Sequence, residues 1–199
     1  MNFNEENKTP QEWIDEYKRL QSIYEDYLRI VMGDALINSQ YVEKVFKFIC
    51  ILIKPIGINI ELEDLLSGDP KRTRYTLGKL KDGMKNTNLF TEDFGKRLDE
   101  YVCRRNRLVH GYFTEHFQSR EDIRVGSSKG EEYADYCGWL IVEGAKLIEV
   151  GLGIYSVLGL NYKIEEVSDP EHLRILKDFE QFKELGFSVV KRARIESET

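Results

Sequence analysis

The stretch SKGEEYADYCGWLIVEGAKLIEVGLGIYSVL, residues 128–158, carries the longest apolar pattern of the sequence. Its apolar residues recur at spacings of three and four, the period of one face of an α-helix. Ser128 and Glu131 form a capping-box pattern at its start. Gly144 and Gly151 lie seven residues apart on one face, where they favour close packing against another helix, either within the bundle or at a dimer seam. We therefore predict one long helix, densely packed along that face.

The same period predicts helices on both sides of this stretch. Thr9, Pro10 and Glu12 form a capping box with proline at the first helical position. The apolar stripe that follows contains Trp13, Tyr17, Leu20, Tyr24, Tyr27 and Val31, and the pattern resumes at Val42, Val45, Phe46, Ile49 and Ile53. Shorter helices are predicted around Leu77–Met84, from a cap at Thr91 toward Leu108, and after Asp169-Pro170.

No segment combines alternating hydrophobicity with hairpin turns, so the predicted fold class is all-α, a helical bundle. The length of 199 residues suits a single domain, with a core bundle over residues 9–160 and a C-terminal extension over 161–199. No single apolar stripe is visibly surplus to the bundle, so the sequence does not define a dimer surface.

Composition narrows the class of protein. The formal net charge is −6, which argues against indiscriminate coating of nucleic acid. The three cysteines, Cys50, Cys103 and Cys137, fit neither a disulfide framework nor a zinc site, and each lies in an apolar run that predicts a buried thiol. We expect no cofactor and no metal. Without a signal peptide or a membrane-spanning run, the expected location is cytoplasmic.

Charge is concentrated in one segment. Residues 71–107 hold eleven Lys and Arg against five Asp and Glu, so this segment is +6 and the rest of the chain −12. A basic face on an acidic protein suggests a partner that carries phosphate. The alternative, which charge alone favours, is a solvated helix face whose cations pair with nearby acids.

One string in this segment combines groups that can act on a phosphodiester: CRRNRLVHGY, residues 103–112. Asn106 and His110 are four residues apart and share a helix face. Arginine binds phosphate by a two-point contact, and histidine can transfer a proton near neutral pH. On spacing alone, a histidine near a helix end is more often a capping or half-buried residue than a catalyst.

The string Arg105-Asn106-Arg107-Leu108-Val109-His110 resembles the R-N-x-x-x-H motif of the HEPN superfamily (higher eukaryotes and prokaryotes nucleotide-binding domains). Tyr112 extends the match to R-x4-H-x-Y, which is similar to toxins paired with minimal nucleotidyltransferase antitoxins. The similarity covers about ten residues and their helical context. It implies a HEPN-like antiparallel helical bundle with an additional C-terminal helix, and a homodimer in which two motifs form one cleft.

The resemblance also implies roles for individual residues. Arg105 would bind the scissile phosphate, His110 would act as general base or acid without a metal, and Asn106 would position the reacting hydroxyl or the histidine. Tyr112 would line the site, and the matching tyrosine of the toxin branch is modified by adenylylation. Five further cations of the segment are candidates for RNA binding: Arg104, Arg107, Lys71, Arg72 and Arg74. Arg104 and Arg107 could equally pair with acids such as Glu100.

The leading interpretation is therefore a metal-independent endoribonuclease of toxin or antiviral type, acting on RNA and with an antitoxin as a further candidate partner. Whether the chain is an enzyme stays open, because many members of the superfamily have lost catalysis. The alternative is a non-catalytic HEPN-like module that binds nucleotide or RNA. In a third interpretation the motif is coincidental, which requires Arg105 and His110 to point apart.

Overall fold

The fold is described from a computed structural model, in which residues 8–55, 57–60, 75–159 and 188–189 are placed well enough to describe. The elements are α1 (Pro10–Ile53), α3 (Leu77–Lys85), α4 (Glu92–Arg107), the π-helix η2 (Leu108–Tyr112), α5 (Phe113–His116), the 3₁₀-helix η3 (Arg120–Ile123) and α6 (Ser128–Gly159). These described residues contain no β-strand, and the all-α class is confirmed. The predicted helix after Asp169 lies outside them.

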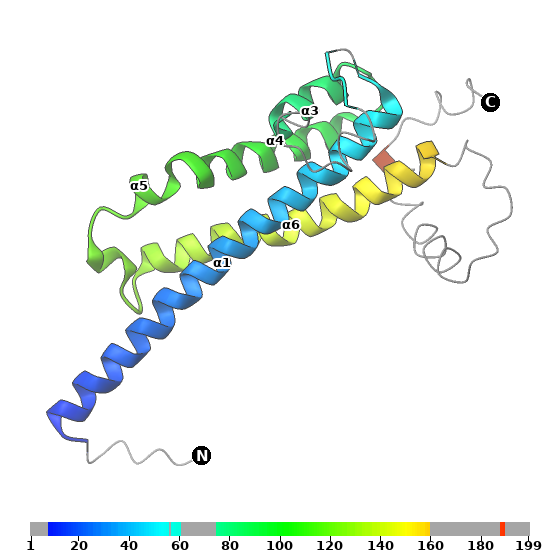
Figure 1. The fold of residues 1–199 in the computed structure, drawn as a ribbon. Coiled ribbons are helices and arrows are strands. Elements are labelled where there is room, and N and C mark those ends of the chain that lie inside the picture. The colour runs from blue at the N-terminus through cyan, green and yellow to red at the C-terminus, as the bar shows by residue number, and fades with distance from the viewer. Residues whose placement is uncertain (1–7, 56, 61–74, 160–187, 190–199) are drawn as a thin grey trace, which may run out of the picture.

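Three long helices form the body of the molecule (Figure 1). Helices α1 and α6 run in the same direction, since Tyr24 lies against Gly130 and Val45 against Gly151. Helix α4 runs antiparallel to both, because Arg97 pairs with Glu143 near one end and the Tyr136 hydroxyl donates to the Arg104 carbonyl nearer the other. In chain order, α1, α4 and α6 therefore alternate in direction, so that α1 and α6 are parallel to each other.

The glycines of α6 let α1 approach closely, as the sequence predicted. A Cβ atom on Gly144 would stand 2.5 Å from Asn38 Oδ1 and 2.8 Å from the Tyr101 hydroxyl. One on Gly151 would stand 2.4 Å from Val45 Cγ1. Around this contact the core contains Val42, Phe46, Ile49, Tyr101, Leu140, Leu147 and Ile154, all fully or almost fully buried.

Two N-caps predicted from sequence are confirmed. The Thr9 side chain accepts from Glu12 N–H, and the Glu12 carboxylate accepts from Thr9 N–H, so both halves of the capping box are present. The Thr91 side chain accepts from Phe94 N–H at the start of α4. In each case the threonine satisfies a backbone donor that has no partner within the helix.

Exposure along α1 and at one cysteine could not be read from the sequence patterns. The apolar stripe at the start of α1 lies in two environments: Trp13, Tyr17, Leu20 and Tyr27 are 42–49 % exposed, whereas Tyr24 and Val31 are partly buried against the core. Helix α1 instead buries Leu28 and Ala35 on another face, against α6. The prediction that all three cysteines are buried is wrong for Cys103, which is exposed because α4 turns Leu98, Tyr101 and Val102 inward.

Candidate functional site

The Arg105–Tyr112 motif spans the junction where α4 becomes the π-helix η2. At this junction the Leu108 N–H is shared by the carbonyls of Arg104 and Arg105. A π-helical turn contains an extra residue, which changes the directions in which side chains leave the helix, and such turns are frequent at functional sites. Here Leu108 and Tyr112 are buried, whereas His110 is exposed.

Arg105 differs from the other described arginines of the basic segment. Its Nη1 donates to Asn106 Oδ1 at 3.1 Å, its Nε is buried without a hydrogen-bond partner, and no carboxylate of the described residues pairs with it. An unpaired guanidinium with a spare buried donor is costly in a folded protein unless a ligand satisfies it. Arg105 and Asn106 therefore form a pair of polar groups that can accept a bound anion.

His110 is presented to solvent one helical turn beyond Asn106. Its side chain makes no hydrogen bond or ion pair with the residues that the structure describes. No hydrogen bond joins it to Arg105 or Asn106, so the structure places these three residues on one short segment without connecting them. An exposed imidazole in this setting can donate or accept a hydrogen bond with a bound ligand.

Arg104 and Arg107, the other two arginines of the motif, are already paired. Arg104 Nη2 forms an ion pair with Glu100 at 2.8 Å, and the Arg104 guanidinium lies 4.1 Å from the centre of the Trp139 ring. Arg107 Nε donates to Glu115 at 3.2 Å, and its guanidinium lies 5.2 Å from the centre of the Tyr112 ring. Acids and aromatic faces thus reduce the charge that these two arginines offer to RNA.

Tyr112 belongs to a buried aromatic cluster. Its side chain is 4 % exposed, and its ring lies 4.2 Å from that of Tyr136 and 4.4 Å from that of His116, measured between centroids. Burial is the main cause that raises the pKa of Tyr112, although the charge of Arg107 opposes it. The phenol therefore stays protonated at neutral pH and acts as a hydrogen-bonding core residue.

His116 holds a position that the sequence did not assign to it. Its Nε2 lies 3.2 Å from the Tyr112 hydroxyl and 3.1 Å from a carboxylate oxygen of Glu132. The spacing of four between Tyr112 and His116 was the available signal, whereas Glu132 lies on α6 and no local pattern indicated it. These contacts connect α5 to α6. In the described residues, no group of His, Cys, Asp or Glu could hold a metal ion.

Most other described cations of the basic segment are also neutralised. Lys81 and Lys85 both pair with Asp99, Lys96 pairs with Glu92, and Arg97 pairs with the largely buried Glu143. Surface pairs of this kind contribute little to stability, but they cancel local charge. Lys71, Arg72 and Arg74 lie outside the described residues.

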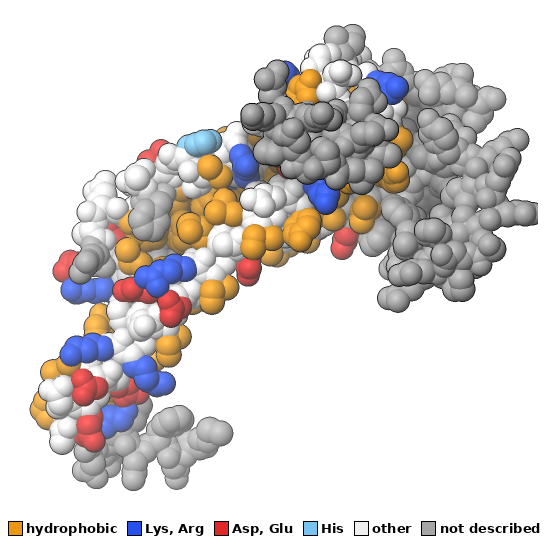
Figure 2. Space-filling view, in the orientation of Figure 1, with side chains coloured by type: hydrophobic (Ala, Val, Ile, Leu, Met, Phe, Trp, Pro, Cys, Tyr) orange, Lys and Arg blue, Asp and Glu red, His pale blue; other side chains and the backbone are white. Residues whose placement is uncertain are grey.

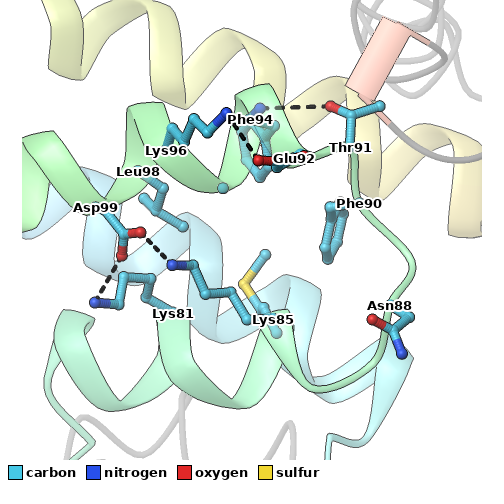
Figure 3. Close-up of a pocket in the computed structure, with 12 residues that line it drawn as sticks. Lys81, Lys85, Asn88, Phe90, Thr91, Glu92, Phe94, Lys96, Leu98 and Asp99 are labelled. Carbon is cyan, nitrogen blue, oxygen red and sulfur yellow. Dashed lines mark hydrogen bonds and ion pairs between the residues drawn. The ribbon is translucent and has the colours of Figure 1, made fainter.

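Two cavities lie away from the motif. One, of about 460 Å³, opens between α3 and α4, with Phe90, Phe94 and Leu98 among its lining residues and the Lys81–Asp99–Lys85 cluster at its edge (Figure 3). The other, of about 660 Å³, lies between α1 and the α5–α6 connection, where apolar side chains form its floor (Figure 2). Asp99 pairs with both lysines at the edge of the first cavity, and Arg29 at the second cavity pairs with Glu25 and Asp26. Neither cavity therefore offers the unpaired charge found at Arg105.

Comparison with known proteins finds no matching family model, no matching curated protein and no matching solved structure. None of the helices in the described parts of the chain has the length and apolar character needed to cross a membrane.

Proposed function

We propose that the surface formed by Arg105, Asn106 and His110 binds RNA phosphate and that the protein is a HEPN-like, metal-independent ribonuclease. The observation that carries this proposal is the state of Arg105. It is the only described arginine of the basic segment without a carboxylate partner, and its buried Nε has no acceptor. The other supports are the R-N-x-x-x-H-x-Y string, the all-α fold and the π-helix that exposes His110.

The proposed reaction is attack of a ribose 2′-hydroxyl on the adjacent phosphorus. A base removes the proton of the 2′-hydroxyl, the new O–P bond forms, and the bond from phosphorus to the 5′-oxygen breaks. That oxygen leaves with a proton from an acid, and a 2′,3′-cyclic phosphate remains. Arg105 would stabilise the negative charge that develops on the phosphoryl oxygens, an electrostatic role that commonly contributes most of the rate. His110 would serve as the base or the acid.

Among the residues that the structure describes, His110 is the one exposed imidazole, while the reaction needs a base and an acid. Under this proposal a second copy supplies the other group, in agreement with the homodimer that the HEPN resemblance implies. A toxin or antiviral role, and an antitoxin partner, would be extensions of the same proposal.

The second candidate function is a non-catalytic module that binds nucleotide or RNA. One observation favours it: no described side chain orients the His110 imidazole by a hydrogen bond, whereas catalytic histidines are usually held by a further group. In that case Arg105 would bind phosphate, and RNA would be bound without turnover.

Cleavage of RNA in EDTA by wild type and His110→Ala separates the two functions. The nuclease proposal expects 2′,3′-cyclic phosphate ends from wild type and a loss of cleavage of about 10²-fold or more in His110→Ala, at an unchanged melting temperature. His116→Asn is the control for loss of an imidazole nearby. RNA binding without cleavage by the wild type would favour the binding module, and cleavage that survives in His110→Ala would exclude His110 from the mechanism.

A further inference from the structure

Helix α1 presents an apolar face that the rest of the described chain leaves uncovered. Seven large side chains on this face are 42–61 % exposed: Trp13, Leu20, Ile23, Tyr27, Ile30, Ile37 and Tyr41. We call these residues, together with Asp34, the α1 seam. The buried residues of α1, such as Leu28 and Ala35, lie on a different face, against α6.

The spacing within the α1 seam is that of a coiled coil. From Leu20 to Tyr41 the seam residues are separated alternately by three and four positions, and Trp13 precedes Leu20 by seven. A 3.5-residue repeat keeps one narrow stripe facing a partner helix over several turns. Packing against α6 does not use this repeat, so it requires another helix.

The first turns of α1 also need a partner. Among the described residues, the hydrogen bonds from α1 to other elements begin at Gln21, which accepts from Val125 N–H and donates to the Ile123 carbonyl. Residues Pro10–Leu20 extend past the body of the molecule with mostly exposed side chains (Figure 1). Helices in proteins gain most of their stability by packing an apolar face, and the apolar side chains of these first turns are exposed. A second helix along the seam would stabilise these turns.

We propose that the α1 seam pairs with the α1 seam of a second copy of this chain, in an antiparallel coiled coil. About half the surface of seven large side chains, at roughly 150–250 Å² for an aromatic one, gives about 600 Å² per chain. A pair would bury about 1,200 Å², the lower end of the range for stable interfaces. Because the α1 seam repeats every seven residues, it can pack against an identical seam. A second copy of this chain provides such a seam.

Charge selects the antiparallel direction. Residues 10–31 hold five acids and three bases, and residues 32–54 hold two acids and three bases, so the two halves of α1 are −2 and +1. Parallel pairing in register would place Asp34 opposite the partner's Asp34 in the seam, where two carboxylates repel. Antiparallel pairing brings each acidic half alongside a basic half.

Charge also favours one register of the two antiparallel helices. In an antiparallel coiled coil centred between Tyr27 and Ile30, Leu20 lies opposite the partner's Ile37 and Trp13 opposite the partner's Lys44. The second contact places an ammonium near an indole ring, which is favourable. Moving the register by one heptad toward the N-terminus would instead set Glu16 against the partner's Asp34. The centred register is therefore preferred.

Sedimentation velocity of the full-length protein across the micromolar range tests the interface. Wild type is expected to be a dimer, and the double variant Ile23→Glu/Ile30→Glu to dissociate at least about a hundredfold more readily, because the seam would bury unpaired charges. Val142→Glu is the control, since Val142 is 55 % exposed on α6 and outside the seam. Circular dichroism and the melting temperature check that each variant is folded.

Disulfide cross-linking tests the direction, in a Cys103→Ser background. Chains carrying Leu20→Cys are expected to cross-link to chains carrying Ile37→Cys, but Leu20→Cys chains not to one another. A monomeric wild type, a dimer that survives the double variant, or efficient cross-linking between Leu20→Cys chains would each overturn the proposal. The inference does not rest on the proposed nuclease, because no seam residue belongs to the Arg105–Tyr112 motif.

Discussion

Arg107 Nε donates to a carboxylate oxygen of Glu115 at 3.2 Å, and this pair neutralises the arginine two positions beyond Arg105. Gly111 makes the pairing sterically easy, because a Cβ atom there would stand 2.9 Å from Glu115 Oε1. The structure thus distinguishes arginines that look equivalent in the sequence. Arg105 keeps its charge available, whereas Arg104 and Arg107 do not.

Glu115→Gln is expected to strengthen RNA binding by releasing Arg107. Each additional cation that contacts phosphate steepens the dependence of log affinity on log salt concentration by about one. Fluorescence anisotropy with a short RNA over a range of KCl concentrations measures this slope. Glu121→Gln is the control, because it removes an equal charge from the pair that Glu121 of η3 forms with Arg124. An unchanged slope in Glu115→Gln would show that RNA does not approach Arg107.

Gly144→Ala is expected to lower the free energy of unfolding by about 1–3 kcal/mol, the usual cost of overpacking. The new methyl group would meet the Tyr101 hydroxyl and Asn38 between tightly packed helices. Gly138→Ala on the same helix is the matched control, because a Cβ atom there meets nothing within 4 Å. It should stabilise the protein by about 0.5–1 kcal/mol through helix propensity alone. Equal effects of the two substitutions in urea denaturation would contradict the described packing of α6.

Some features of the fold could be predicted from the sequence and others could not, because each pattern reports only on residues that are close in the chain. Local chemistry made the caps at Thr9 and Thr91 predictable, and the spacing of Gly144 and Gly151 correctly indicated close helix packing. Periodicity showed that α1 has an apolar stripe, but not that Trp13, Leu20 and Tyr27 would be exposed while Tyr24 packs against α6. A stripe defines a face of a helix and leaves its partner unspecified.

The sequence indicated which residues make up the candidate site, but not which of the nearby charges are paired. The motif located Arg105 and His110, yet the pairing of Arg97 with Glu143 joins residues 46 positions apart, beyond the reach of local patterns. The π-helix at Leu108–Tyr112 has no sequence signature of its own, although it exposes His110 and buries Tyr112. For the described part of the basic segment, the alternative of cations paired with acids proved mostly correct.

One thiol of three is expected to react with a disulfide reagent in the folded protein. Burial raises the pKa of Cys50 to about 12 and that of Cys137 to about 11, so both stay protonated and inaccessible, whereas Cys103 is exposed. Titration in mildly alkaline buffer should count one thiol in wild type, none in folded Cys103→Ser, and three in denatured wild type.

The raised pKa values of Cys50 and Cys137 also predict how the free energy of unfolding depends on pH. Above about pH 9 the unfolded chain releases the thiol protons that the folded chain retains, so the free energy of unfolding falls as the pH rises. Rapid labelling of all three thiols in the native state would contradict the burial of Cys50 and Cys137.

RNA cleavage in EDTA by Arg105→Ala and Arg107→Ala, side by side, tests whether Arg105 is the functional cation of the motif. Each variant loses one arginine, but Glu115 already neutralises Arg107. We expect the cleavage rate to fall by about 10²-fold or more in Arg105→Ala and to change only a few fold in Arg107→Ala. Equal losses in the two variants, or full activity in Arg105→Ala, would contradict this expectation.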